Sequence, residues 1–402
     1  MNRAMTLATA LGALAICIAA PATAKTITVA PGADAQSRLQ EALLDAQPGD
    51  VVQIAAGRYD LTDGLSLDTA KVTIQGAGAD KTILNFKNQQ GAGEGLLVTA
   101  ADVVMKDFAV EDTKGDGIKS KGADRVVYKG LRVEWTGGPK TTNGAYGIYP
   151  VSSTDVLVDS CIVKGASDAG IYVGQSETII VRNSIASGNV AGIEIENSRH
   201  ADVYHNIASH NAGGILVFDL PNLPKMGGGD VRVFENVASD NDTPNFAPKG
   251  NIVASVPTGT GVLVMANENV LVTKNALGGN GTANVMIASY RNAFTDPRYN
   301  PYPRHITVAG NQQGKAGFAP AFPGAEQLKA AMGGTLPPIL WDGAGDSAGI
   351  SVNDNVPVLS LGLAQGAPME TAKPVPVDLS KNAAGPEPAK VVLPESMEMA
   401  AK

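Results

Sequence analysis

Residues 170–191 read GIYVGQSETIIVRNSIASGNVA, and residues 192–213 read GIEIENSRHADVYHNIASHNAG. Each line contains an alternating apolar strand, a turn and a second alternating strand, and neither contains a helical apolar period. Lines of this kind begin 22 or 23 residues apart, with two longer steps. Their first residues are Gly95, Gly117, Gly147, Gly170, Gly192, Gly214 and Gly261, with Asn284 imitating an eighth. A repeat of this length built from short strands predicts an all-β solenoid, a parallel β-helix.

Stacking of the lines predicts which side chains share a column. The residue after each leading glycine should point inward and build the core, as Ile171, Ile193 and Ile215 do. Two asparagine columns should form hydrogen-bonded ladders at rung spacing. One column is Asn206, Asn236 and Asn275, and the other is Asn189, Asn211, Asn241 and Asn280. Cys161 falls in the first column, so we expect an inert, packed thiol.

The ends of the chain differ from the repeats. Residues 1–24 combine one arginine, an apolar run and a small-residue cleavage site, which predicts an export signal peptide. The β-helix should span residues 25–315, and an amphipathic helix from about Ser37 to Ala46 should cap its first coil. Residues 316–366 should form an irregular segment packing on the helix. Residues 367–402, rich in proline and alanine, should form a disordered tail.

Composition excludes some classes of partner. The formal net charge is −8 at pH 7, which disfavours nucleic acid and anionic membranes. No stretch after the signal peptide is apolar enough to span a bilayer, so we expect no membrane insertion after cleavage. We expect a periplasmic or secreted protein. With Cys17 in the signal peptide, Cys161 is the only remaining cysteine, so no internal disulfide is possible.

Three of the four histidines, His200, His205 and His210, lie five residues apart. Residues five apart on a strand point to opposite faces, so these side chains should not converge on a metal ion. We expect them to pair with carboxylates on neighbouring rungs, His205 with Glu235 and His210 with Asp240. The sequence predicts no metal site and identifies no cofactor.

One outward face carries the candidate chemistry. The candidate catalytic residues are Tyr149, Tyr172, Glu194 and Glu196. Tyrosines stack on sugar rings and cations meet uronate carboxylates, so this face is a candidate surface for an acidic polysaccharide. β-Elimination would need a tyrosine base beside Lys119 and Lys121, whereas hydrolysis would need two carboxylates at a set separation.

Insertions interrupt the coils beside this face. They follow Glu134 and Asp219, and the largest precedes Gly261. Long loops in a repetitive scaffold commonly carry function, and these could wall a groove over an apolar stripe that includes Phe218. We expect Lys119, Lys121, Asp219, Asn245 and Lys249 to bind substrate.

Some stretches also resemble a known family. GGILVFDLPNLP, NDTPNFAPKGNIVASVPTGTGVLVMANENV and the Gly-Ile lines resemble exported parallel β-helix repeat proteins encoded in a two-gene pair with a c-type cytochrome. The resemblance runs from about Thr26 to Asn311. It implies a single-stranded right-handed β-helix, similar to pectate lyases, of about ten coils. It also implies export, but no established activity and no catalytic residues.

More distantly, the coils are similar to sugar-active β-helices, yet the Asp-Pro-His-Asp, Gly-His-Gly and Trp-x-x-Asp-His motifs of those enzymes are absent. Two functions therefore stay open. The first is lyase- or epimerase-like binding or modification of an acidic polysaccharide. The second is a non-catalytic periplasmic partner of a c-type cytochrome or a metal-handling system. The sequence does not decide whether the protein is an enzyme.

Overall fold

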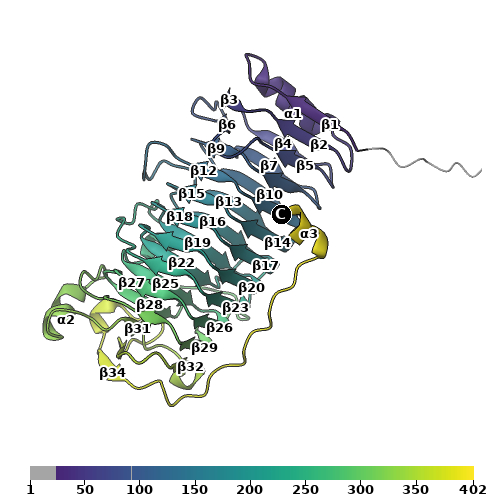
Figure 1. The fold of residues 1–402 in the computed structure, drawn as a ribbon. Helices are drawn as coiled ribbons and strands as arrows, with labels where there is room; N and C mark the ends of the chain where they lie inside the picture. Colours follow the sequence, from purple (N-terminus) through teal and green to yellow (C-terminus); the bar gives the residue numbers. More distant parts are fainter. Residues whose placement is uncertain (1–23, 92) are drawn as a thin grey trace, which may run out of the picture.

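The computed structural model describes residues 24–91 and 93–402. The chain winds into a stack of coils, each contributing strands to three parallel sheets that we call A, B and C (Figure 1). Residues 1–23 of the predicted signal peptide lie outside the described residues. Among the described residues, no helix has the length and apolarity needed to cross a membrane.

The sheets have these members. Sheet A contains β1 (Thr26–Val29), β2 (Val51–Ile54), β5 (Thr73–Gln75), β8 (Val104–Lys106), β11 (Val126–Lys129), β14 (Thr154–Asp159), β17 (Glu177–Arg182), β20 (Arg199–Tyr204), β23 (Gly229–Phe234), β26 (Glu268–Thr273), β29 (Arg304–Ala309) and β32 (Ile350–Val352). Sheet B contains β3 (Gly57–Asp60), β6 (Thr82–Asn85), β9 (Ala109–Glu111), β12 (Arg132–Glu134), β15 (Ile162–Lys164), β18 (Ile185–Ser187), β21 (Ile207–Ser209), β24 (Val237–Ser239), β27 (Ala276–Gly278) and β30 (Gln312–Gln313). Sheet C contains β4 (Leu65–Leu67), β7 (Leu96–Val98), β10 (Ile118–Lys121), β13 (Tyr146–Val151), β16 (Ala169–Gly174), β19 (Ala191–Glu196), β22 (Gly213–Phe218), β25 (Thr260–Met265), β28 (Ala283–Ala288), β31 (Ile339–Trp341), β33 (Val358–Ser360) and β34 (Val375–Val377).

The predicted columns are confirmed by the strand register. Ile171 pairs with Ile193, and Ile193 with Ile215, and all three are fully buried in one continuous core. The alternation of side chains along each strand therefore sends one set inward and leaves the other set on the outer face. At the N-terminal end, helix α1 (Ala35–Asp45) covers the first coil through buried Leu39 and Leu43, close to where the sequence predicted a cap.

The asparagine ladders are also confirmed. In the first ladder the Asn206 Nδ2 donates to Asn236 Oδ1 and the Asn236 Nδ2 to Asn275 Oδ1, each at 3.0 Å. The Asn275 Nδ2 donates to Asn311 Oδ1 at 2.9 Å. The Asn311 backbone N–H and Nδ2 donate in turn to the Asp354 carboxylate at 2.9 and 3.0 Å. The second ladder joins Asn189, Asn211, Asn241 and Asn280 at 3.0, 3.2 and 3.1 Å.

Cys161 lies in the column that the sequence assigned to it. Its backbone N–H donates to Ser184 Oγ, and the backbone N–H of Ser184 donates to Asn206 Oδ1. The thiol is fully buried and unpaired, and burial raises its pKa to about 12. It is therefore a packing residue rather than a reactive one.

The C-terminal part differs from the expectation of an irregular segment followed by a disordered tail. Strands β31, β32 and β33 continue sheets C and A beyond residue 315, beside the short helix α2 (Ala325–Ala331). After β34, which pairs antiparallel with β33, the chain runs back along the outside of the coils and ends in helix α3 (Glu395–Ala400) (Figure 1).

This returning segment is held by apolar and ionic contacts that composition does not reveal. Val391, Leu393 and Met397 are buried in one cluster with three outward residues of sheet A, Val127, Leu157 and Ile180. Glu398 makes a two-point ion pair with the Arg182 guanidinium, at 3.1 and 2.7 Å.

Candidate functional site

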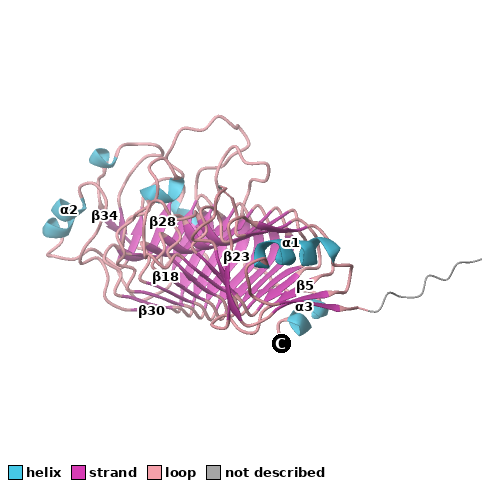
Figure 2. Cartoon of the chain, turned by 90° about the horizontal axis from the view of Figure 1, so that it is seen from above, coloured by secondary structure: helices cyan, strands magenta, loops and turns pink. Residues whose placement is uncertain are grey.

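The outer face of sheet C is the side of the molecule from which the long loops rise (Figure 2). Register places Lys119 beside Tyr149 and Tyr172 beside Glu194, as the sequence predicted. Glu194 and Glu196 then stand beside Leu216 and Phe218 on the next coil. The face thus changes from charged and aromatic near the N-terminal coils to apolar near the C-terminal coils.

Three tyrosine rings pack together on this face. The centroid of Tyr146 lies 4.5 Å from those of Tyr149 and Tyr172, and Tyr149 and Tyr172 are 5.0 Å apart at an edge-to-face angle. Tyr172 is buried, and its hydroxyl donates to Glu196 Oε1 at 2.6 Å. Burial raises the pKa of both Tyr149 and Tyr172, so neither phenol ionises readily to act as a base.

Beside the tyrosines lie three carboxyl groups, which we call the carboxyl cluster: Asp168, Glu194 and Glu196. Their exposed fractions are only 6%, 2% and 8%. Burial, followed by the neighbouring Glu196 charge, raises the pKa of Asp168 to about 7. Burial and the charges of Asp168 and Glu196 raise the pKa of Glu194 well above its ordinary value, and burial raises that of Glu196. Burial thus favours the protonated form of all three groups.

Hydrogen bonding within the cluster is incomplete. Glu194 and Glu196 interact directly, and this contact favours the proton on Glu194. Asn251 Nδ2 donates to Asp168 Oδ2 at 3.2 Å from the loop above. No donor from the described residues reaches the buried Oε2 of Glu194. An unpartnered buried oxygen beside a proton-holding carboxyl pair is an arrangement suited to proton transfer.

Lys119 is not free to act as the cation that sequence reasoning assigned to it. Its ammonium group lies 3.0 Å from Glu94 Oε1, 3.1 Å from Asp116 Oδ2 and 4.7 Å from the centroid of the Tyr149 ring. Burial opposes the charge, but the two carboxylates outweigh it and raise the pKa of Lys119. Its charge is already balanced by the protein, whereas Lys121 on the same strand is exposed.

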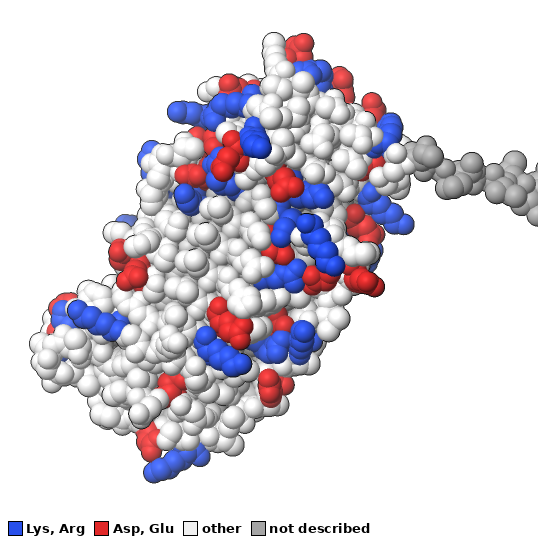
Figure 3. Space-filling view, in the orientation of Figure 1, with Lys and Arg blue, Asp and Glu red and all other residues white. Residues whose placement is uncertain are grey.

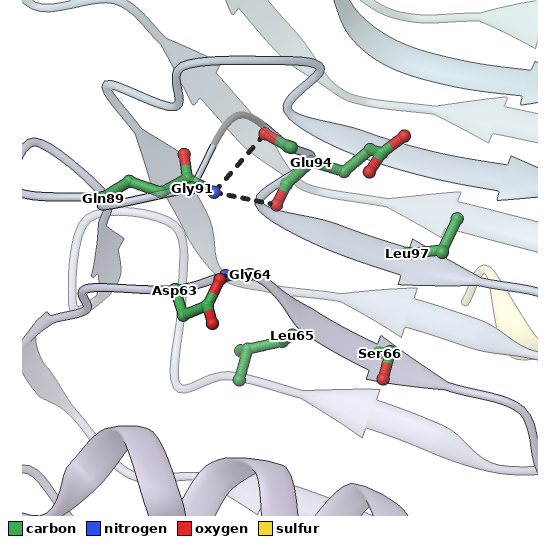
Figure 4. Close-up of a pocket in the computed structure, with 9 residues that line it drawn as sticks. Asp63, Gly64, Leu65, Ser66, Gln89, Gly91, Glu94 and Leu97 are labelled. Carbon is green, nitrogen blue, oxygen red and sulfur yellow. Dashed lines mark hydrogen bonds between the residues drawn. The ribbon is translucent and has the colours of Figure 1, made fainter.

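A hollow of about 200 Å³ at the N-terminal end of the face is lined by Glu94, the ion-pair partner of Lys119. It lies between Asp63, Ser66 and Glu94, where the Gln89 side chain donates to the backbone carbonyls of Gly93 and Glu94 (Figure 4). Its rim is polar and acidic. At the other end of the face, beyond Phe218, lies an apolar cleft of about 570 Å³.

Two of the three predicted insertions cover the face, and the first does not. The segments 219–228 and 240–259 pack Met226, Ile252 and Val256 onto the apolar outer side chains of sheet C. In the insertion after Glu134, Trp135 instead joins the inner core, and the loop lies at the corner between sheets B and C. Segment 289–303, which the sequence analysis missed, adds Tyr290 and Tyr299 to the cover.

The predicted substrate-binding residues of the loops have structural contacts. Asp219 is buried and its Oδ1 accepts the N–H groups of Gly227 and Gly228 at 2.9 and 3.0 Å. Asn245 spans its own loop, since its Nδ2 donates to two carbonyls of the same segment. Lys249 is exposed on the loop surface. Asp219 and Asn245 are thus held by the protein and Lys249 is accessible, and substrate binding by these residues stays a prediction.

The residues that sequence reasoning missed are Asp168, Tyr146 and Asn251. Asp168 immediately precedes β16, the strand that carries Tyr172. Tyr146 is the first residue of β13, the strand that carries Tyr149. Strand alternation identifies neither residue, because Tyr146 lies three residues before Tyr149, out of step with the outward column, and Asp168 lies outside β16. Asn251 reaches the cluster from an irregular loop, for which no sequence signal exists.

The histidines do not form a site. His200, His205 and His210 all adopt a left-handed backbone conformation, with φ of 53–56°, and their side chains project to solvent. His205 pairs with Glu235 at 2.9 Å as predicted, whereas His210 pairs with Asp242 at 3.0 Å rather than with Asp240. Within residues 24–91 and 93–402, no group of His, Cys, Asp and Glu side chains is arranged to hold a metal ion.

Comparisons with known proteins agree with this architecture. A family model described as "Right handed beta helix region" matches residues 72–223. The mannuronan C-5 epimerase AlgE4 A-module of Azotobacter vinelandii is 15% identical with a TM-score of 0.54, covering 81% of this chain and 92% of that one. The Family 28 exopolygalacturonase of Yersinia enterocolitica is 13% identical with a TM-score of 0.51, covering 83% and 71%.

The polygalacturonase of Erwinia carotovora ssp. carotovora is 12% identical with a TM-score of 0.50, covering 73% of this chain and 92% of that one. At these identities the likeness concerns the fold, and it confirms the expected right-handed parallel β-helix. None of the curated proteins matches the chain in sequence.

Proposed function

We propose that this protein binds an acidic polysaccharide along the outer face of sheet C and modifies it by proton transfer through the carboxyl cluster. The observation that carries the proposal is the gathering of Asp168, Glu194 and Glu196, all with raised pKa, under a tyrosine cover, with one Glu194 oxygen unpartnered. Solved neighbours named as a mannuronan epimerase and as polygalacturonases support a polysaccharide as the substrate class.

The cluster suits an anionic sugar because burial raises the pKa of all three carboxyl groups and so disfavours their charged forms. A neutral Glu194 repels no uronate carboxylate and has a proton with which to hydrogen-bond it. Asp168, with a pKa of about 7, is divided between its acid and base forms at neutral pH. It is therefore the group in the cluster best suited to accept or return a proton at sugar carbon or oxygen.

This mechanism differs from the elimination with a tyrosine base that was one of the two mechanisms considered from the sequence. A tyrosine base is disfavoured because burial raises the pKa of Tyr149 and Tyr172. Lys119 could neutralise the carboxylate of a uronate only if its ammonium group broke its ion pair with Glu94 or Asp116. Access to Asp168 requires displacement of the Asn251 side chain, so we propose that glycan binding turns this side chain away from Asp168 while the rest of the 240–259 loop stays in place.

The test is a panel of uronate polymers and neutral glucans offered to the purified full chain. Binding is measured by affinity electrophoresis, and products are followed by absorbance of new double bonds, by NMR of the uronate configuration and by reducing ends. We expect uronate-specific binding. Asp168→Asn and Glu194→Gln should abolish turnover, while an Asp80→Asn control, at a carboxyl group that is 95% exposed and outside sheet C, retains it. Absence of uronate binding, or turnover unchanged in both cluster variants, would falsify the proposal.

We also propose export to the periplasm or beyond, on the strength of the signal-like residues 1–24. Cell fractionation and N-terminal sequencing test this, with Lys25 as the expected first residue. A cytosolic protein that retains residues 1–24 would contradict it.

A second function, a non-catalytic partner of a c-type cytochrome or another periplasmic protein, is favoured by one observation. Ile185, Ile207 and Val237 form an exposed aliphatic column on sheet B, with exposed fractions of 36%, 41% and 38%. Figure 3 looks onto this side and shows an uncharged strip among the charged residues. If no glycan binds, a cytochrome c binding assay with Ile207→Lys tests this alternative, which requires weaker binding by the variant.

A further inference from the structure

The apolar cleft beyond Phe218 has a rigid floor and a separate roof. Outward side chains of β22, β25 and β28 form the floor, including Phe218, Met265 and Met286. The roof comes from segments 252–258, 289–292 and 321–323. The enclosed volume of about 570 Å³ lies within the range of pockets that take small molecules.

The roof is braced by hydrogen bonds, so the cleft is a preformed space. Asn245 donates through Nδ2 to the carbonyls of Val253 and Val256, both at 2.9 Å. Its backbone N–H donates to Thr258 Oγ1 at 3.0 Å. The floor is fixed by strand register, so it cannot move up to fill the space. Only the Met265 and Met286 side chains are soft enough to adapt to an occupant.

The two charged groups around the cleft are already engaged by the protein. Asp342 accepts from Ser289 through both its N–H, at 2.7 Å, and its Oγ, at 2.6 Å, and from the Ala344 N–H at 3.0 Å. The Arg291 guanidinium donates to the Ala367 carbonyl and to Met369 Sδ. Among the described lining residues only Asp342 and Arg291 belong to the acidic and basic residue types, and both are turned to internal partners.

We propose that this cleft binds an uncharged, predominantly apolar small molecule, aromatic or branched aliphatic. A sugar is disfavoured because its hydroxyl groups would lose their hydrogen bonds to water on entering the cleft. The thioethers and aromatic rings that line the cleft offer few hydrogen-bond donors or acceptors in return. The proposal goes beyond the polysaccharide function and does not depend on it. Register places Phe218 one rung, about 4.8 Å, from Glu196, so the site adjoins the carboxyl cluster but has different chemistry.

The test uses N-phenyl-1-naphthylamine, an uncharged aromatic probe whose fluorescence rises in apolar surroundings, with the full chain in its native state. We expect saturable binding of one probe per chain. Met286→Lys places a charge in the floor and should weaken binding at least about tenfold, since an ammonium group does not share an apolar site with a neutral ring. Met399→Lys, at a methionine that is 57% exposed, is the matched control and should bind as the wild type does.

Ala288→Phe provides a second variant that fills the cleft without adding charge, in case Met286→Lys disturbs folding. It should also weaken binding while the circular dichroism spectrum and melting temperature stay those of the wild type. Excess oligouronate should leave probe binding unchanged. Non-saturable binding, equal affinity in the folded Ala288→Phe variant, or displacement by oligouronate would each overturn the assignment of a separate apolar site.

Discussion

Replacing Asp168 by asparagine should make the stability of this protein much less sensitive to pH. The folded protein holds a proton on Asp168 up to about pH 7, whereas the ordinary pKa of an aspartic acid is 3.8. A group whose pKa is raised by folding stabilises the native state fully below its unfolded pKa. That stability is lost as the pH rises through the folded pKa. The free energy of unfolding should therefore fall between about pH 4 and about pH 7.

The size of the effect follows from the pKa. The gap between 3.8 and about 7 corresponds to about 4 kcal/mol, since each tenfold change in an equilibrium constant is worth about 1.4 kcal/mol. Asparagine keeps an oxygen that accepts from Asn251 but carries no titrating proton. Between about pH 4 and pH 7, the free energy of unfolding of the variant should therefore fall by on the order of 4 kcal/mol less than that of the wild type. Because the Asp168 charge also raises the pKa of Glu194, its removal reduces the remaining pH dependence further.

Urea unfolding followed by far-ultraviolet circular dichroism, repeated across this pH range, measures the effect. The control is Asp80→Asn, at a carboxyl group that is 95% exposed, which should reproduce the wild-type pH profile. If Asp168→Asn shows the same loss of stability between about pH 4 and pH 7 as the wild type, Asp168 is not protonated in the folded state. The carboxyl cluster would then lose its assigned role.

Three further predictions concern parts of the fold outside the site. Asn236→Ala should lower the free energy of unfolding by about 3–5 kcal/mol, because it leaves the buried backbone N–H and one side-chain N–H of Asn206 without acceptors. Chemical denaturation measures this, and Asn88→Ala, at an exposed asparagine, should change it by less than about 0.5 kcal/mol. Cys161 should react with a thiol reagent only at the rate of unfolding, since burial raises its pKa to about 12, and rapid labelling of native protein would contradict its placement. Leu393→Asp should release the C-terminal segment while the β-helix stays folded, so limited proteolysis should remove that segment first; an unchanged cleavage pattern would refute this packing.

Much of the fold could be predicted because the repeat determines register. Once Gly170 and Gly192 are aligned, strand alternation determines that Tyr172 and Glu194 point outward in one column, and the structure places them there. The asparagine ladder follows from the same alignment. These are local properties that recur from coil to coil.

The contacts that complete the candidate site are not periodic. Asp168 lies just before β16, where strand alternation does not set the side-chain direction, and Asn251 reaches it from 83 residues away. The returning tail shows the same limitation. Its composition is that of a disordered segment, yet Leu393 and Met397 match apolar side chains on sheet A that alternation leaves facing outward.

The asparagine ladder that ends at Asp354 bears on how the molecule meets copies of itself. Every amide in that column donates toward the next coil, so the aligned dipoles direct their positive ends toward the C-terminal end of the stack. The Asp354 carboxylate receives them, and both of its oxygens are occupied by Asn311 and Gln313. A carboxylate has no N–H to pass on, so the column cannot continue into a second molecule. With α1 over the opposite end, the two ends of the stack present different structures, so the asparagine column of one molecule does not continue into the column of another.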